Sequence, residues 1–157
     1  MNPVSEWAYE LLSCLKDAGH HLPYFSCNLI VDKVDDKLAC LLKKSNFWMV
    51  NLGIESFQDR VLNGIRKKIT RVQIDQAIDC LKRHGIRVFG NLMMYNVWED
   101  DGRLQFQTHE EVDEDIRIAR SLIIRSKMDY MSWSFATPIP GSELWEIAGR
   151  HGLMWVN

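Results

Sequence analysis

The strongest constraint on the fold is a regular alternation of short apolar runs with longer amphipathic segments. Four runs have the length and composition of buried strands, at residues 24–30, 48–54, 86–95 and 130–135. Each run is apolar along most of its length, which is typical of parallel strands that are covered by helices or closed into a barrel. The sequence therefore predicts an α/β protein with about four parallel strands.

The segments between these runs carry helix start and stop signals. Thr70-x-x-Gln73 and Thr108-x-x-Glu111 have the capping-box pattern, and Gly85 stands where a helix terminator is expected. Because each signal precedes or follows apolar residues at helical spacing, we expect a helix at both places. Further helix starts are predicted at Asn2-Pro3, Asp32 and Ser142.

The segment from Asn96 to Gln107 lacks a clear helix or strand pattern. It contains the acidic, glycine-bearing stretch Trp98-Glu99-Asp100-Asp101-Gly102. A loop of about 12 residues at the carboxyl end of a strand is long enough to serve as a lid or a binding loop. We expect an irregular loop here.

Length and composition limit the class of protein. The 157 residues are 46% hydrophobic and carry a formal charge of -2, so we expect residues 1–157 to form a single domain. The charge argues against general nucleic-acid or membrane-surface binding, which would favour a basic patch. No apolar run approaches the roughly 20 residues of a membrane span, and no secretory signal pattern is present. These features predict a cytoplasmic protein.

The sequence contains few signs of metal or nucleophilic chemistry. The four cysteines are too far apart for a CxxC or CxxxCxxC ligand set, which favours reduced thiols, and the histidines lack metal-ligand spacing. Neither GxSxG nor GxxxxGK[ST] occurs. We therefore predict no metal ligand and no catalytic residue in this chain. The cysteines are Cys14, Cys27, Cys40 and Cys80.

Several short segments, taken together, resemble a known family. They are Leu52-Gly53-Ile54-Glu55-Ser56, Val61-Leu62, Ile65-Arg66-Lys67-Lys68-Ile69-Thr70, Gly85-Ile86 and Thr137-Pro138-Ile139-Pro140-Gly141-Ser142-Glu143-Leu144. In order and spacing they resemble the later part of the radical S-adenosylmethionine (radical SAM) domain over roughly residues 25–152. The likeness is greatest to the branch shared by methylthiotransferases, Elongator-type enzymes and cobalamin-dependent enzymes.

This resemblance implies a partial (β/α)6 TIM-like barrel with helices outside. In the family, a CxxxCxxC loop holds a 4Fe-4S cluster, and the amino acid end of S-adenosylmethionine binds the fourth iron. This sequence has no such motif. We therefore expect the carboxyl-terminal portion of the barrel, without its first strands and cluster loop, as a fragment, a split gene product or a degenerate homologue. Such a chain should be inactive alone; the whole enzyme would be a methyl- or methylthiotransferase, with cobalamin or a second cluster in a partner domain.

Five residues are predicted to face the cofactor. By resemblance, Glu55 would hydrogen-bond the ribose hydroxyls or the amino acid end, and Lys67 would pair with the cofactor carboxylate. Gly53 lets a ligand approach the backbone, Ser56 supplies a hydroxyl, and Asn91 is a polar residue inside a buried run. In the alternative interpretation Glu55 caps a short helix at residues 57–62, Gly53 serves packing and Lys67 is a solvated lysine.

Four further residues are predicted to face the substrate. Asn96 lies where the family has a Gly-Leu-Pro-Gly turn, from which this chain departs. Thr137, Pro138 and Gly141 belong to a turn that fixes two φ angles and allows one unusual backbone conformation. Related barrels take substrate at this loop; a rigid turn that only begins the last helix explains the pattern equally well.

Two functions of other classes remain open from the sequence. A partial barrel exposes strand edges, so the chain could be a non-catalytic module that forms a homodimer or binds a partner, including the missing barrel half or a second chain. An unrelated open sheet could instead bind a nucleotide or flavin near Gly53 and Gly141. The lack of a phosphate loop counts against the second alternative.

Overall fold

A four-stranded parallel sheet organises the molecule. The computed structural model describes residues 3–17 and 24–154, with side chains from residue 6 onward. The sheet order is β1-β2-β3-β6, and each neighbouring pair is parallel. This confirms the predicted α/β fold and its four parallel strands. The strands are β1 (Phe25–Leu29), β2 (Phe47–Glu55), β3 (Arg87–Met94) and β6 (Tyr130–Phe135).

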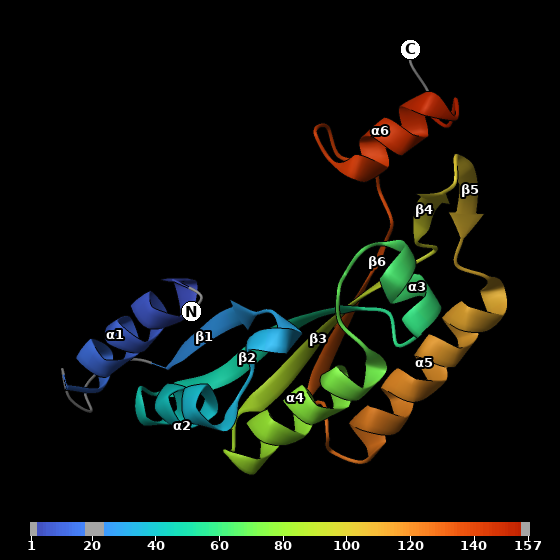
Figure 1. The fold of residues 1–157 in the computed structure, drawn as a ribbon. Helices are drawn as coiled ribbons and strands as arrows, with labels where there is room; N and C mark the ends of the chain where they lie inside the picture. Colours follow the sequence, from blue (N-terminus) through green and yellow to red (C-terminus); the bar gives the residue numbers. More distant parts are fainter. Residues whose placement is uncertain (1–2, 18–23, 155–157) are drawn as a thin grey trace.

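Helices cover one face of this sheet. Figure 1 shows α2 (Asp36–Lys44), α4 (Arg71–Arg83) and α5 (His109–Ile124) on the same side, and α1 (Pro3–Asp17) lies beside α2. Alternate strand residues point toward these helices and form the buried core, because side chains in a strand alternate between the two faces. The core includes Val50, Leu52, Ile54, Val88 and Leu92.

Most of the helix signals are confirmed. Thr70 and Thr108 both form complete capping boxes, and Gly85, at φ 66°, follows the end of α4. Ser142 caps α6 (Glu143–Arg150) through Trp145. The predicted start at Pro3 is also confirmed, whereas Asn2 lies outside the described residues.

The predicted cap at Asp32 is wrong. Asp32 lies in the short 3-10 helix η1 (Val31–Lys33), and the helix α2 is capped by Asp35, which accepts a hydrogen bond from the backbone of Leu38 at 2.7 Å. The physical reason is that three aspartates follow one another closely here, and the extra 3-10 turn moves the helix start by three residues.

The expected irregular loop is a hairpin. Its strands are β4 (Val97–Asp100) and β5 (Arg103–Phe106), paired antiparallel. Asp101 and Gly102 connect them with φ values of 46° and 71°. Two left-handed residues in a two-residue turn match the right-handed twist of the strands, and Asp-Gly is a preferred pair for such a turn. The Asp-Gly pair is thus the local sequence signal for this hairpin.

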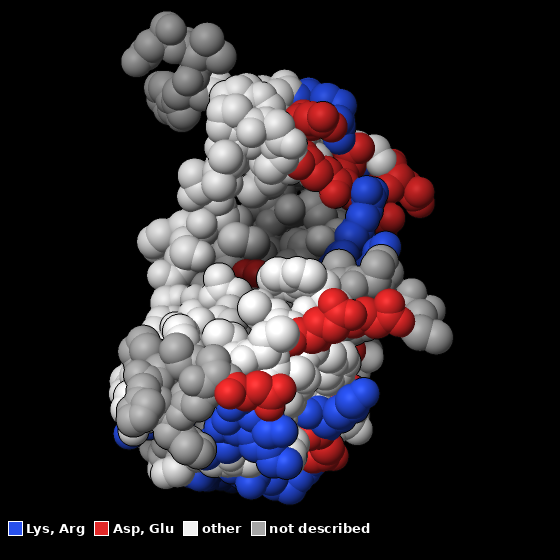
Figure 2. Space-filling view, turned by 90° about the vertical axis from the view of Figure 1, so that its left-hand side faces the viewer, with Lys and Arg blue, Asp and Glu red and all other residues white. Residues whose placement is uncertain are grey.

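The hairpin, α6 and α3 (Asp59–Gly64) gather at the carboxyl ends of the strands (Figure 1). Arg66 pairs with Glu143 at 2.7 Å, and His151 contacts Glu99 at 2.8 Å, so α6 is tied to both neighbours. Figure 2 shows a hollow between this upper group and the body of the molecule. Among the described residues, no helix is both long and apolar enough to cross a membrane.

Candidate functional site

The sheet face opposite the helices carries a row of small and polar residues. Gly53 of β2 pairs in register with Asn91 of β3, and Asn91 pairs with Ser132 of β6. One layer further from the carboxyl ends, Asn28 of β1 pairs with Asn51 of β2. We call this set, together with Glu55 and Lys67, the open-face site. It lies at the edge of the sheet where loops leave the strands, which is the usual ligand side of parallel α/β proteins.

Hydrogen bonds hold the amides of this row in place. Asn51 donates to Asn28 at 2.8 Å, and the Ser132 hydroxyl donates to the Asn91 side-chain oxygen at 2.8 Å. The Asn91 amide reaches the Leu52 carbonyl at 3.5 Å. The Oδ1 atom of Asn51 is buried without a hydrogen-bond partner among the described residues. A buried acceptor of this kind is costly unless a donor reaches it.

Glu55 and Lys67 form an ion pair above the row. Lys67 Nζ lies 2.7 Å from Glu55 Oε1, and both side chains are about one-quarter exposed. Glu55 has φ 67°, a left-handed conformation that is costly for a residue with a side chain. The register between β2 and β3 shifts at this point, between Gly53 and Glu55. The strained backbone therefore directs the last carboxylate of the strand onto the open face.

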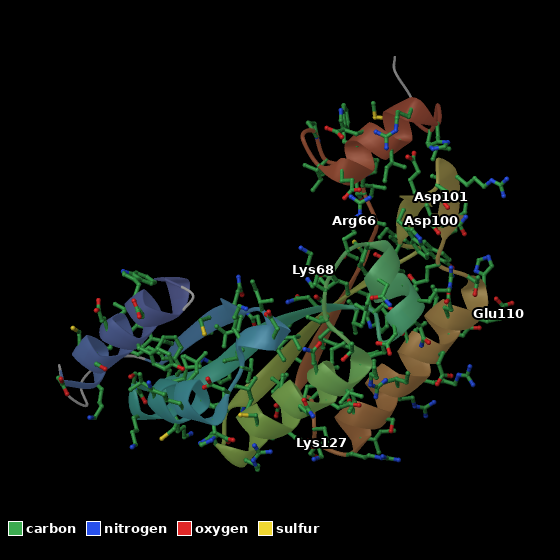
Figure 3. All side chains as sticks on the ribbon, in the orientation of Figure 1. Arg66, Lys68, Asp100, Asp101, Glu110 and Lys127 are labelled. Carbon is green, nitrogen blue, oxygen red and sulfur yellow. The ribbon has the colours of Figure 1, made fainter. Side chains whose placement is uncertain are left out.

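The end of α3 sets the position of Lys67. The Lys67 backbone N–H donates to the Leu62 carbonyl at 2.9 Å, and the Arg66 N–H donates to the Asn63 carbonyl at 3.1 Å. These two bonds close the helix in a Schellman motif. Arg66 and Lys68 are both left-handed, with φ values of 55° and 58°. Figure 3 labels these two residues in the loop after α3. Because a tight turn fixes its backbone, Lys67 is held toward Glu55 rather than being a freely solvated lysine.

Gly53 leaves the space that this ion pair occupies. A Cβ atom at this position would lie 3.1 Å from Lys67 Nζ and 3.2 Å from Glu55 Oε1. The alternative role of Glu55 as a helix cap does not hold, because α3 begins at Asp59 and the preceding Gln58 occupies the cap position. Gly53 therefore belongs to the open-face site through its missing side chain.

Ser56 lies outside the open-face site. It is fully buried, and its hydroxyl donates to Asp115 Oδ2 at 2.7 Å. Asp115, on α5, also accepts hydrogen bonds from the Phe57 backbone at 2.9 Å and from the amides of Gln58 and Gln107 at 3.1 and 2.8 Å. Burial raises the pKa of the Asp115 carboxyl above its usual range, against the effect of these hydrogen bonds. This network fixes the turn that follows β2.

Asn96 lines a separate cavity of about 120 Å³, which also borders Gly64, Trp98 and Ile147. Its amide nitrogen donates to the Met93 carbonyl at 2.8 Å and to Gln107 at 2.9 Å. Its Oδ1 atom is buried without a partner among the described residues. The cavity is lined by two polar side chains, Asn96 and Glu143, among mostly apolar residues.

The other predicted substrate residues lie beyond β6. The Thr137 hydroxyl donates to the Phe135 carbonyl at 3.1 Å, and Pro138 is half-buried. Gly141 has φ 85°, with open space where a side chain would be. The structure thus brings Gly53, Glu55, Lys67 and Asn91 together but leaves these three in the connection to α6.

Sequence reasoning missed several polar residues of this face. The missing signal was a period of two within runs that were interpreted as simply apolar, as in Asn51-x-Gly53-x-Glu55 and Ser132-x-Ser134. Such alternation separates a covered face from an open one. The residues missed on the open face are Asn28, Asn51, Ser132 and Ser134, and Asp115 was missed in the buried network.

Comparison with known proteins decides the family. The model of the radical SAM superfamily matches residues 4–107. The chain belongs to the radical SAM superfamily. This confirms the resemblance that its motifs carried.

Two similar proteins carry methyltransferase-type names. The chain is 32% identical over 124 residues to an uncharacterized methyltransferase of Pyrococcus horikoshii, covering 79% of this chain and 24% of that protein. It is 27% identical over 117 residues to a protein of Methanocaldococcus jannaschii named as a proposed methylthiotransferase, covering 74% and 23%. This radical SAM chain therefore spans about a quarter of the length of these relatives.

A solved structure shows the same fold. The radical S-adenosylmethionine methyltransferase TsrM from Kitasatospora setae, with cobalamin and a [4Fe-4S] cluster bound, matches with a TM-score of 0.66 and 15% sequence identity. The match covers 83% of this chain and 25% of that one. At this identity the likeness supports the radical SAM fold and no finer property.

The described residues do not fit a 4Fe-4S cluster, which is held by converging cysteine thiolates. Cys14 lies on α1, Cys40 on α2 and Cys80 on α4, all outside the open face, and Cys27 of β1 packs against the core. Burial raises the pKa of the Cys27 thiol to about 11. S-adenosylmethionine fits better, because the open-face site offers a cation and a carboxylate beside a strand residue without a side chain, Gly53.

Proposed function

We propose that this chain is the later part of a radical SAM barrel and that its open-face site binds S-adenosylmethionine in an enzyme of methyl- or methylthiotransferase type. The observation that carries the proposal is the Glu55–Lys67 ion pair, which stands beside Gly53 at the carboxyl end of the sheet. The family match and the methyltransferase-like relatives support it. The proposal covers residues 1–157 as one domain of a longer or composite enzyme.

The two charges of the ion pair are complementary to polar groups of this cofactor. The Lys67 ammonium group would meet the carboxylate of the amino acid moiety, and Glu55 would accept hydrogen bonds from the ribose hydroxyls or the amino group. Gly53 would let the ligand lie close to the strand, and Asn51 and Asn91 would contact it from below. Ser56 would not contact the cofactor directly, because its hydroxyl donates to Asp115; it would instead hold the turn after β2 in place.

The chemistry itself would come from the cofactor. S-adenosylmethionine supplies, on reductive cleavage, a carbon-centred radical that begins the reaction by hydrogen abstraction. This chain would bind, orient and shield the cofactor, while the 4Fe-4S cluster would be held by a segment or chain that carries the CxxxCxxC motif. Cobalamin in a partner domain is part of the same proposal, and so is a cytoplasmic location.

The substrate would enter from the side of α6 and the hairpin. Asn96 lines the 120 Å³ cavity at this side and has an unpartnered side-chain oxygen, which would suit a donor group on a substrate. Thr137, Pro138 and Gly141 would shape the same edge through the connection between β6 and α6. These roles rest on position, because the three residues lie outside the lining of that cavity.

The partner in this proposal is the polypeptide that completes the barrel. β1 and β6 lie at the two edges of the described sheet, so each presents unpaired backbone groups there. Either the missing barrel half or a second copy of this chain could pair with these edges. In the alternative function, a non-catalytic binding module, the same two edges would bind the partner. The flavin alternative loses support because the described sheet has no reversal of strand order, which forms the crevice of doubly wound folds.

Binding of S-adenosylhomocysteine to the full chain by calorimetry tests the proposal. We expect Lys67→Met to weaken binding at least about tenfold, because a charge-assisted hydrogen bond contributes roughly 1.5–3 kcal/mol. Lys82→Met is the matched control, since Lys82 forms a similar 2.8 Å ion pair with Asp129 and is equally exposed, but this pair lies at the amino end of β6. Equal affinity of the wild type and Lys67→Met would overturn the proposed site.

Sedimentation at several concentrations separates the catalytic from the binding-module interpretation. A mass that doubles with concentration, with no affinity for S-adenosylhomocysteine, would favour the module. Binding of the analogue by the monomer, or only after addition of a polypeptide with the CxxxCxxC motif, would favour the radical SAM function.

A further inference from the structure

We propose that Asp36, Cys80 and His84 form a binding site for a divalent transition metal, zinc above all. The site lies on the helix-covered side, between the first turn of α2 and the end of α4. It is separate from the open-face site and from any 4Fe-4S cluster. It would tie the two helices together.

The geometry brings three different donor atoms to one point. Cys80 lies in the last turn of α4, His84 is the C-cap residue of the same helix, and Asp36 begins the neighbouring helix α2. The Asp36 Oδ1 atom lies 3.1 Å from His84 Nε2 and 3.6 Å from Cys80 Sγ. All three donor atoms lie within 4.8 Å of one another. Zinc binds such ligands at about 2.0–2.3 Å, which places tetrahedral donors roughly 3.2–3.8 Å apart. A small movement of the side chains completes the set.

The donor types select the metal. Sulfur, imidazole nitrogen and carboxylate oxygen together suit zinc and similar transition metals, whereas calcium and magnesium prefer oxygen alone. A cysteine thiolate and the Asp36 carboxylate would balance the two positive charges of the ion. A neutral imidazole of His84 would supply the third ligand, leaving one position for water.

Arg83 is the group that competes with the metal. Its guanidinium lies 3.1 Å from the same Asp36 oxygen, and its side chain is 60% exposed. Because such an exposed side chain is weakly held, a metal at Oδ1 would leave Arg83 free to pair with the other carboxylate oxygen. The ion pair therefore lowers affinity for the metal without closing the site.

The surroundings give access and hold the ligands. A surface cavity of about 290 Å³ borders Asp36, Cys80 and Arg83, so an ion could reach the donors from solvent. Asp35 caps α2 immediately before Asp36. At the end of α4, Ile86 and Gly85 donate to the carbonyls of Leu81 and Lys82 at 3.0 Å, which fixes the turn that carries His84.

Cobalt titration of the full, untagged chain after chelator treatment tests this site. We expect one Co²⁺ per chain, with the thiolate-to-cobalt absorption band and tetrahedral visible bands, and displacement by one equivalent of Zn²⁺. Cys80→Ser should abolish the thiolate band, and His84→Asn should weaken binding at least about tenfold. The His84 variant keeps the test decisive if the buried Cys80→Ser protein fails to fold.

Matched controls are Cys40→Ser and His109→Asn, which remove a thiol and an imidazole elsewhere and should retain one metal per chain. Circular dichroism of each variant checks the fold. Absence of a thiolate band in the wild type would overturn the proposal, as would full affinity in His84→Asn. Affinity for S-adenosylhomocysteine should be the same in His84→Asn and wild type, because the two sites are separate.

Discussion

The two faces of the sheet differ although they are built from the same strands. On β2, Val50, Leu52 and Ile54 are fully buried beneath the helices, whereas the alternating residues Asn51 and Glu55 face the open side. The covered face contains close-packed apolar side chains. The open face contains an unpartnered oxygen, a left-handed glutamate and an ion pair. One face therefore stabilises the fold, while the other keeps costly features that favour ligand binding.

The largest expected effect compares two adjacent residues of β3. Leu92 is 1% exposed and Asn91 lies on the open face. Leu92→Ala should lower the free energy of unfolding by about 2–5 kcal/mol, because it removes buried methyl groups and leaves a cavity. Asn91→Ala should lower it by only about 0.5–1.5 kcal/mol, the contribution of its hydrogen bonds. Urea unfolding measures both values, and a larger loss for Asn91→Ala would contradict the division between the faces.

A second prediction concerns the buried carboxyl that lies behind the site. Burial raises the pKa of Asp115 in the folded protein. At a pH between the ordinary carboxyl pKa and this higher native pKa, the native state therefore keeps a proton that the unfolded chain has released. Stability from this group is therefore complete below the ordinary pKa and is lost as the pH rises through the higher native pKa. The Asp115→Asn variant has no titrating group at this position, so it serves as the reference.

Urea unfolding of both proteins over a series of pH values checks this prediction. The free energy of unfolding of the wild type, minus that of Asp115→Asn, should fall as the pH rises above the ordinary carboxyl pKa. A difference that instead increases with pH would mean that the four hydrogen bonds to Asp115 outweigh its burial.

The smallest expected effect concerns backbone strain at the open face. Glu55→Gly should raise the free energy of unfolding by up to about 1 kcal/mol, because glycine adopts the left-handed conformation without strain. The greater chain entropy that glycine loses on folding offsets part of this gain. The same change should weaken binding of S-adenosylhomocysteine. Asp101→Gly is the matched control, since Asp101 is also left-handed but lies in the hairpin turn.

Thermal unfolding and calorimetry distinguish the two variants. Glu55→Gly should change both stability and affinity, whereas Asp101→Gly should change stability alone. If Glu55→Gly keeps full affinity, Glu55 is not a ligand of the open-face site.

Signals that act over a few residues were the most predictable. The capping boxes at Thr70 and Thr108 and the terminator at Gly85 are all confirmed, because each depends on contacts within about five residues. The cap predicted at Asp32 is instead Asp35, because three nearby aspartates offer the same local chemistry. The hairpin around Asp101 departs from the predicted loop although its Asp-Gly turn is a local signal, because strands of four residues are too short to show a clear alternation.

The sequence by itself determined the strands, most helix ends and the radical SAM family, because these depend on local periodicity and on motif order. Only the tertiary structure decided which polar groups meet. Glu55 and Lys67 are 12 residues apart, Asp36 and Cys80 are 44 apart, and Ser56 and Asp115 are 59 apart. Their contacts depend on how helices pack across the sheet, and that packing follows from the buried apolar residues rather than from the polar residues themselves.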